Sequence, residues 1–240
     1  MLIDLHAHSS GISQCCRATA EEVIAAAQSV GLDGLVLTNH YQKSYVTDGD
    51  YSAFARKYID EYAYARQCGD RLDCRIFFGV EVTMEQYAVH LLLYGVDEEF
   101  VLNHPMMFGY SQEKLYGLVK ESGGILIQAH PFRGNVNRLL DLRYLDGVEV
   151  NCHPMYEETH LAELSGIAAR SGGLLTCGGD YHADTHRPRC GVYLPDHIQS
   201  TKEIKEYLCS ADSFKLCVQE TRSTQWKTVV FRRGKALPEL

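Results

Sequence analysis

The feature that most constrains the fold of this chain is a series of short apolar runs, each leading directly into a histidine or an acidic residue. The first run, Leu2 to Leu5, leads into His6 and His8, and the run that begins at Gly34 leads into His40. Side chains at positions i and i+2 of a strand point the same way, so His6 and His8 face one point. The same pattern recurs along the chain, with His90 inside its run: Glu81, His90, His130, His153, Asp180 and His182.

The segments between these runs have helical signals. Thr19 and Glu22 form a capping-box pattern at the start of a helix expected over 20–30, and Gly31 is a suitable residue to end it. Further helices are expected over 51–68, 112–121, 157–170 and 204–209, and strands over 1–5, 34–38, 75–82, 89–94, 124–128, 146–150, 173–177, 214–218 and 228–231.

Alternating strands and helices, with nearly continuous apolar strands, predict an α/β fold with a mainly parallel sheet covered by helices. A closed barrel and an open doubly wound sheet both satisfy this pattern. No GxGxxG follows the first strand, which argues against a dinucleotide-binding site.

Length and composition narrow the class of protein. A chain of 240 residues fits a single α/β barrel domain, and a net charge of -8 argues against nucleic acid as an obligate partner. No apolar run is long enough to span a membrane, and the N-terminus lacks the pattern of a signal peptide. Nine cysteines without a CxxC pair indicate reduced thiols in a cytoplasmic protein rather than a cysteine zinc site. We expect Cys152 and Cys177 to be small core residues.

The polar residues at the strand ends predict a metal site. The carboxyl ends of parallel strands gather at one edge of an α/β fold, and burying so many titratable groups without a metal or partners would be costly. Histidine suits zinc, iron and manganese, and carboxylate suits manganese as well. His90 and His104 compete for one ligand position. The other expected ligands are His6, His8, His40, Glu81, His130, Asp180 and His182.

Five motifs together resemble the PHP (polymerase and histidinol phosphatase) domain superfamily: HAH at 6–8, TNH at 38–40, GVE at 79–81, AHP at 129–131 and GGDYH at 178–182. The resemblance covers residues 1–194. It implies a distorted (β/α)7 TIM-like barrel, which residues 195–240 would complete or cover, so that 1–240 form one domain. It also implies two or three divalent metal ions (Zn, Mn or Fe).

The resemblance assigns ligands to each metal. His6, His8, Glu81 and Asp180 would hold the first, Glu81 would bridge to a second held with His90 and His130, and His40 and His182 would hold a third. In the family, another ligand to the third metal often comes five or six residues after the HxH pair, where this chain has Ser13 and Gln14. The third metal therefore stays open, with Cys15 or Cys16 as substitutes or as packing residues.

The activity implied is that of a metal-dependent phosphoesterase, in which a hydroxide bridging two metals attacks a small phosphorylated metabolite or nucleotide. The expected catalytic residues are Glu81, Asp180 and His182. Arg133 is the first candidate to bind phosphate, ahead of Arg187 and Arg189, and the expected substrate-binding residues are Arg133, Arg189 and His153. The alternatives are an amidohydrolase-like enzyme, which the lack of a strand-end lysine disfavours, and a non-catalytic metal-binding module. The sequence does not choose the substrate, the metal or the oligomeric state.

Overall fold

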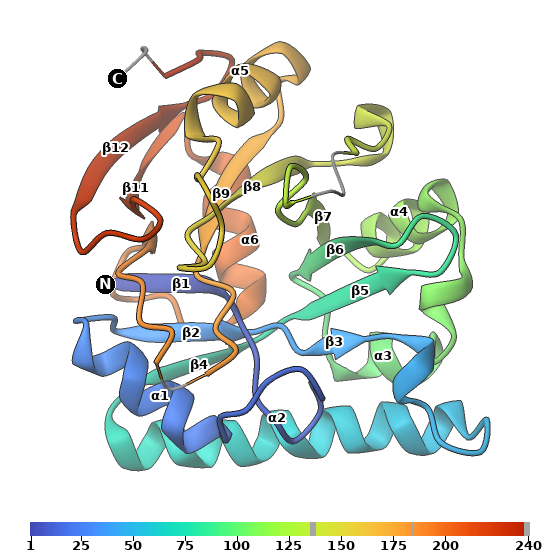
Figure 1. The fold of residues 1–240 in the computed structure, drawn as a ribbon. Helices are drawn as coiled ribbons and strands as arrows, with labels where there is room; N and C mark the ends of the chain where they lie inside the picture. Colours follow the sequence, from blue (N-terminus) through green and yellow to red (C-terminus); the bar gives the residue numbers. More distant parts are fainter. Residues whose placement is uncertain (135–137, 184, 238–240) are drawn as a thin grey trace.

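The computed structural model describes residues 1–134, 138–183 and 185–237, and within them the chain alternates strands and helices as expected (Figure 1). The helices are α1 (Ala20–Ser29), α2 (Tyr51–Leu72), α3 (Glu98–Asn103), α4 (Gln112–Glu121), α5 (Leu161–Ser171) and α6 (Thr201–Ser210). The strands are β1 (Leu2–Ala7), β2 (Gly34–Leu37), β3 (His40–Tyr41), β4 (Arg75–Phe78), β5 (Val80–Met84), β6 (Val89–Tyr94), β7 (Ile125–Gln128), β8 (Gly147–Asn151), β9 (Leu174–Gly178), β10 (Gly191–Tyr193), β11 (Ser213–Gln219) and β12 (Trp226–Arg232).

The described strands form two six-stranded sheets. The first has the order β12-β11-β10-β1-β2-β4, and the second has the order β3-β5-β6-β7-β8-β9. The neighbours β1/β2, β2/β4, β3/β5, β7/β8 and β8/β9 are parallel, whereas β6 and the three strands from β10 to β12 pair antiparallel. The α/β class is confirmed, but the sheets are more mixed than the sequence predicted.

The two sheets meet where strands pass from one to the other. The strand expected over 75–82 is divided into β4 and β5 at Gly79, where a Cβ atom would lie 2.6 Å from Val36 Cγ1 and 2.8 Å from Thr38 Cγ2. The sheets also meet between β9 and β1, where the amide of Asp180, just after β9, donates to the carbonyl of His6 in β1 at 2.8 Å. These contacts join the sheets, but the ladders do not form one continuous closed sheet in the described chain, so the seven-stranded barrel stays a prediction.

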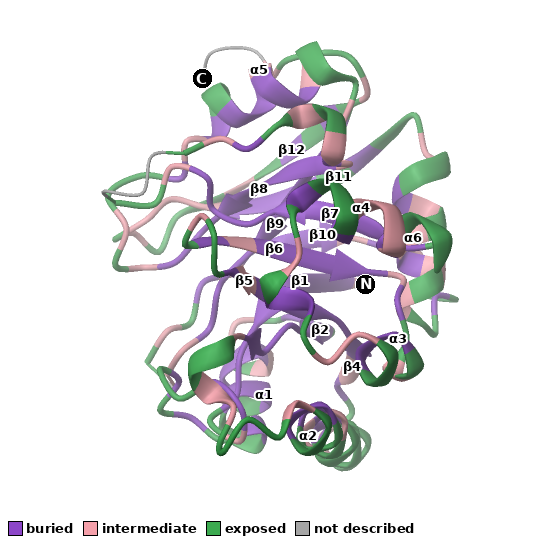
Figure 2. Cartoon of the chain, turned by 90° about the vertical axis from the view of Figure 1, so that its right-hand side faces the viewer, coloured by how far each residue is buried: buried purple, intermediate pink, exposed green. Residues whose placement is uncertain are grey.

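The apolar strands form the core, and the helices cover them with one face each (Figure 2). Helix α1 begins at the predicted capping box, since Thr19 and Glu22 exchange hydrogen bonds with each other's backbone amides. Helix α2 continues four residues past the expected end at residue 68 and stops at Asp73, whose backbone is in the left-handed region. Helix α3 was not expected. None of the helices in the described part of the chain is both long enough and apolar enough to cross a membrane.

The C-terminal strands extend the first sheet beyond β1. Strand β10 pairs antiparallel with β1, and the hairpin of β11 and β12 continues the sheet from β10. The N-terminal ammonium group also contacts Asp196 Oδ1 at 2.7 Å. The β11–β12 hairpin is therefore part of the same sheet as β1.

Candidate metal centre

The end of β1 places two imidazoles side by side, as the i, i+2 spacing predicted. His6 and His8 have no exposed surface, and their Nε2 atoms are 3.0 Å apart. The His6 Nδ1 atom donates to Glu149 Oε1 at 2.8 Å, and the His8 Nδ1 atom is 3.1 Å from Ser13 Oγ. Each ring is fixed by a contact at its Nδ1 atom, so that the two Nε2 atoms lie next to each other.

The Glu81 carboxylate lies at the centre of five histidines. Its oxygens are 2.6–3.3 Å from the nearest imidazole nitrogens, and the carboxylate is fully buried. Burial alone would raise the pKa of Glu81, but the surrounding imidazoles, His40 and His6 foremost, hold this pKa well below its ordinary value. The five histidines are His6, His8, His40, His90 and His130.

Asp180 is the second buried carboxylate of the cluster. It follows β9 with a left-handed backbone (φ 54°), and its Oδ1 atom lies 3.0 Å from His8 Nε2 and 3.2 Å from His182 Nδ1. The Tyr156 hydroxyl donates to Oδ2 at 3.1 Å. Burial opposes ionisation, but the charges of His6 and His182 keep the pKa of Asp180 well below its ordinary value.

The donor atoms fit divalent cations. Nitrogen and oxygen atoms come within 4.8 Å of one another in four overlapping groups of three. His40 Nδ1 and Glu81 Oε2 are only 2.6 Å apart, yet neither atom has a hydrogen-bond partner among the described residues. A buried ring nitrogen and a buried carboxylate oxygen without hydrogen-bond partners are atoms that a bound cation would satisfy. The groups are His6–His8–Glu81, His6–His130–Asp180, His40–Glu81–His90 and His8–His40–His182.

The structure brings His90 into this cluster and leaves His104 outside it. His90 Nδ1 is 2.9 Å from Glu81 Oε1, whereas His104 follows α3 and packs its ring against Phe100 and Tyr110. Of the two histidines that competed for this ligand position, the geometry favours His90.

The three expected substrate-binding residues have different positions. Arg133 is half exposed, with Nη1 4.0 Å from Asp180 Oδ2, and His153 stacks against Tyr156 at 4.6 Å beside the cluster. Burial lowers the pKa of His153 to about 4. The position of Arg189 corrects the sequence prediction. Its guanidinium donates to the carbonyls of Val30 and Gly31 and lies over the Trp226 ring, so it is used in holding α1 to the C-terminal hairpin.

Sequence reasoning missed Glu149, which connects several parts of the site. In addition to His6, it accepts hydrogen bonds from the His130 amide and from Asn151 Nδ2, each at 3.1 Å. The sequence did contain a signal for this role, because Glu149 is a single acidic residue inside the apolar run of β8. A buried carboxylate of this kind needs polar partners.

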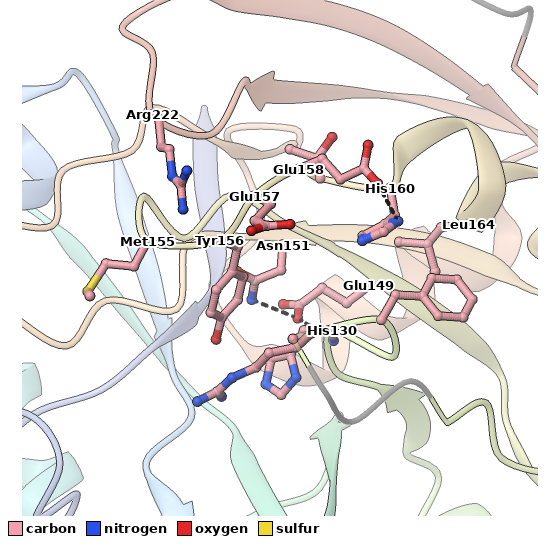
Figure 3. A pocket seen from close by; sticks show the side chains of 14 residues that line it. His130, Glu149, Asn151, Met155, Tyr156, Glu157, Glu158, His160, Leu164 and Arg222 are labelled. Atoms are coloured by element: carbon pink, nitrogen blue, oxygen red, sulfur yellow. Dashed lines mark hydrogen bonds and ion pairs between the residues drawn. The ribbon is translucent and has the colours of Figure 1, made fainter.

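A cavity of about 400 Å³ opens beside His130 (Figure 3). Glu149 and Asn151 lie at its inner end, and Tyr156 and Glu157 stand on the segment that follows β8. Arg222 reaches toward it from the turn between β11 and β12. The cavity is lined by both positively and negatively charged side chains, and a small molecule could reach the histidine cluster through it.

Three buried thiols form a separate group. Cys152, Cys177 and Cys190 lie within 4.8 Å of one another, with the first two sulfur atoms 3.7 Å apart. All three belong to the main hydrophobic core cluster. Cys152 and Cys177 are thus core residues, as the sequence predicted.

The similarity to known proteins is structural. No protein-family model and no curated protein sequence matches the chain. A two-domain protein from Bacteroides vulgatus that contains a predicted PHP-like metal-dependent phosphoesterase superposes with a TM-score of 0.64 at 12% identity, covering 99% of this chain and 88% of its own. A proposed metal-dependent phosphoesterase from Bifidobacterium adolescentis gives 0.53 at 18% identity, covering 86% of this chain and 95% of its own.

An amidohydrolase from Chromobacterium violaceum, determined with bound sulfate and no metal, gives a TM-score of 0.60 at 19% identity and covers 86% of this chain and 96% of its own. The chain thus shares the fold of these proteins, one of which is described as PHP-like, and this is the kind of fold that the resemblance of the five motifs implied.

Proposed function

We propose that this protein is a metal-dependent phosphoesterase that hydrolyses a small phosphorylated metabolite or nucleotide. The observation that carries the proposal is the buried Glu81 carboxylate with five histidine nitrogens within 3.3 Å. We propose two or three divalent ions, of zinc, manganese or iron. The proposed ligands are His6, His8, His40, Glu81, His90, His130, Asp180 and His182.

When bound, two neighbouring divalent ions activate water and neutralise the charge of a phosphoryl group. Glu81 spans the cluster, with one oxygen near His90 and His130 and the other near His40, and so fixes the separation of the donor groups. Asp180 Oδ1 lies 3.2 Å from His182 Nδ1, so the ionised carboxylate can orient His182, and a protonated His182 can transfer a proton to the leaving oxygen.

Arg133 stands at the boundary between the cluster and the cavity. Its guanidinium is 4.0 Å from Asp180 and 5.2 Å from the centre of the Tyr156 ring, and it remains accessible to an incoming anion. A guanidinium binds phosphate through two parallel hydrogen bonds, which would orient the ester against the metal ligands. The size of the cavity suits a metabolite or a nucleotide better than a polymer.

The test combines metal content with a substrate panel. We expect the purified protein to bind at least two equivalents of zinc or manganese and to release phosphate from one class of small phosphate ester. Asp180→Asn should lower this rate by more than about 100-fold, because it removes a carboxylate that would hold a metal ion and that orients the proton donor His182. Asp196→Asn, which changes an exposed carboxylate at the N-terminal ammonium group, is the matched control.

Two outcomes would contradict the proposal. Hydrolysis of amides but not of phosphate esters would favour the amidohydrolase-like alternative, in line with the fold shared with the Chromobacterium violaceum protein. Tight metal binding without any hydrolysis in a broad panel would favour a non-catalytic metal-binding module.

A further inference from the structure

The three buried thiols of the core connect the two sheets. Cys177 is in β9 and Cys152 directly follows β8, and both strands belong to the second sheet. Cys190 directly precedes β10, which belongs to the first sheet. Their sulfur atoms all lie within 4.8 Å of one another, so side chains carried by both sheets converge on one point.

The backbone holds these thiols in place. The Cys152 amide donates to the Gly178 carbonyl at 2.9 Å, which fixes the end of β8 beside β9. Gly191, next to Cys190, packs so closely on β1 that a Cβ atom there would clash with the Ile3 carbonyl. None of the three cysteines is more than 1% exposed. The convergence of the thiols is therefore a property of the folded core.

Weak contacts occupy the three sulfur atoms. Cys177 Sγ donates to the Cys217 carbonyl at 3.3 Å, and Cys190 Sγ lies 3.7 Å from Asp4 Oδ2. Because a thiol is a weak donor and a weak acceptor, a metal ion that replaces the thiol protons gives up little hydrogen bonding.

The spacing of the sulfur atoms fits a metal ion between them. Three sulfur atoms around one ion, each at the zinc–sulfur distance of about 2.3 Å, are about 4 Å apart. Here the Sγ atoms of Cys152 and Cys177 are 3.7 Å apart, and all three atoms lie within 4.8 Å of one another. Small side-chain rotations would therefore bring all three sulfur atoms to bonding distance from one central ion.

We propose that Cys152, Cys177 and Cys190 bind a thiophilic divalent cation such as zinc, at a site separate from the histidine cluster. Thiolates select such cations over magnesium, calcium and manganese. Binding releases the three thiol protons to solvent and forms three metal–sulfur bonds, with no change of oxidation state. The lack of a CxxC pair does not exclude this site, because its ligands come from three separate segments of the chain. The inference does not depend on the proposed function.

Cadmium-113 NMR of the metal-free, reduced protein separates the two sites in one sample, because cadmium bound by sulfur resonates far downfield of cadmium bound by nitrogen and oxygen. We expect the wild-type protein to show one far-downfield resonance in addition to the signals of the histidine cluster. Cys190→Ala should lose this resonance and one equivalent of cadmium, and should keep the other signals. Cys74→Ala changes a buried thiol beside β4 in a different core cluster and is the matched control, which should keep all signals.

The outcomes separate this inference from the proposed function. Signals of the histidine cluster without a far-downfield resonance overturn the thiolate site and leave the proposed metal centre standing. A far-downfield resonance that survives in Cys190→Ala also overturns it, because another thiol then holds the ion. A far-downfield resonance that is lost in Cys190→Ala, in a protein without signals of the histidine cluster, supports the thiolate site and contradicts the proposed function.

X-ray absorption of the zinc-saturated wild-type protein tests the same bonds without a variant, and so applies even if Cys190→Ala does not fold. We expect sulfur neighbours at about 2.3 Å from zinc, besides nitrogen and oxygen neighbours at about 2.0–2.2 Å. Zinc with nitrogen and oxygen neighbours alone contradicts the proposal.

Discussion

At the scale of single residues, Glu149 determines how His6 faces the metal centre. Its carboxylate accepts from His6 Nδ1, so that Nε2 keeps its lone pair for a cation, and it also accepts from the His130 amide. Glu149→Gln replaces one acceptor oxygen by a donor that faces another N–H group. We expect metal affinity to fall about 10- to 100-fold, as measured by competition with a chelating dye.

The control for this variant is Glu163→Gln, which changes an exposed carboxylate on α5. Its metal affinity should equal that of wild type. If Glu149→Gln binds metal as tightly as Glu163→Gln does, then Glu149 has no role in orienting His6.

Two histidines make metal binding depend on pH. Burial alone would lower their pKa values, but Glu81 raises the pKa of His40 to about 9 and Asp180 raises the pKa of His182 to about 11. In the metal-free protein these imidazoles stay protonated at neutral pH, so a metal must displace their protons. Affinity should therefore increase with pH up to at least about 9, and titration calorimetry in buffers of different ionisation enthalpy should show proton release.

The same linkage has the opposite sign for the stability of the metal-free protein. Because the folded-state pKa of His40 is raised from 6.5 to about 9, its ion pair stabilises the fold fully below pH 6.5 and is lost as pH rises through about 9. Chemical denaturation of the metal-free protein across this range is the measurement. An affinity for metal that is independent of pH would show that these imidazoles are already neutral.

The residues of the candidate metal centre were predictable from sequence because their signals are local. A position at the end of an apolar run and the two-residue period of a strand suffice to select His6, His8, Glu81 and Asp180. Glu149 was not found because its partner His6 lies 143 residues away in the chain. Arg189 was wrongly selected because nearness to His182 in sequence does not fix the direction of a long side chain.

At the scale of secondary-structure elements, the end of β9 packs directly against the end of β1. A Cβ atom at Gly178 would lie 2.4 Å from His6 Cβ and 2.6 Å from Glu149 Oε1. Gly178→Ala should therefore displace His6 although residue 178 is not itself a ligand. We expect a loss of about 1–3 kcal/mol in unfolding free energy, the usual cost of overpacking, together with weaker metal binding.

Gly117→Ala on α4 is the matched substitution, because a Cβ atom there meets nothing within 4 Å. It should leave metal binding unchanged and raise the unfolding free energy by about 0.5–1 kcal/mol through helix propensity. Equal behaviour of the two variants in denaturation and metal titration would show that the contact between β9 and β1 does not constrain the site.

The existence of most elements was predictable, but their assembly was less so. Apolar runs and capping signals placed α1 and the strands other than β3 and β10, since these signals depend on neighbouring residues. The division at Gly79 depends on Val36 and Thr38 from another strand, which the run over 75–82 does not reveal. The antiparallel pairing of β6 is likewise set by contacts between strands rather than by the apolar pattern.

At the scale of the whole molecule, the metal centre depends on chain segments that are distant in sequence. Its proposed ligands come from both sheets, with His6 in β1 of the first sheet, Glu81 in β5 of the second, and His182 in the segment after β9. Each sheet alone would carry only part of the donor set. The fold thus brings residues that are distant in sequence into one site. A substitution that weakens the contact between the two sheets should therefore also lower the affinity for metal.

The last prediction concerns the single domain expected over residues 1–240. Strand β10 joins β1 to the β11–β12 hairpin, whose Leu216 and Phe231 lie in the same core cluster as Ile3. Unfolding of the hairpin should therefore accompany unfolding of the rest. Trp226, the only tryptophan, lies on β12, so its fluorescence reports on the hairpin while far-ultraviolet circular dichroism reports on the whole chain.

We expect the two signals to give the same denaturant midpoint, and a fragment of residues 1–194 to lack a cooperative transition, because it loses the strand that covers β10 and part of the core. A fluorescence midpoint well separated from the dichroism midpoint, or a fragment that folds and binds metal, would instead divide the chain into two units. In that case the metal centre would belong to the first unit alone, and the extension of the sheet past β10 would be an addition to a domain that is already complete.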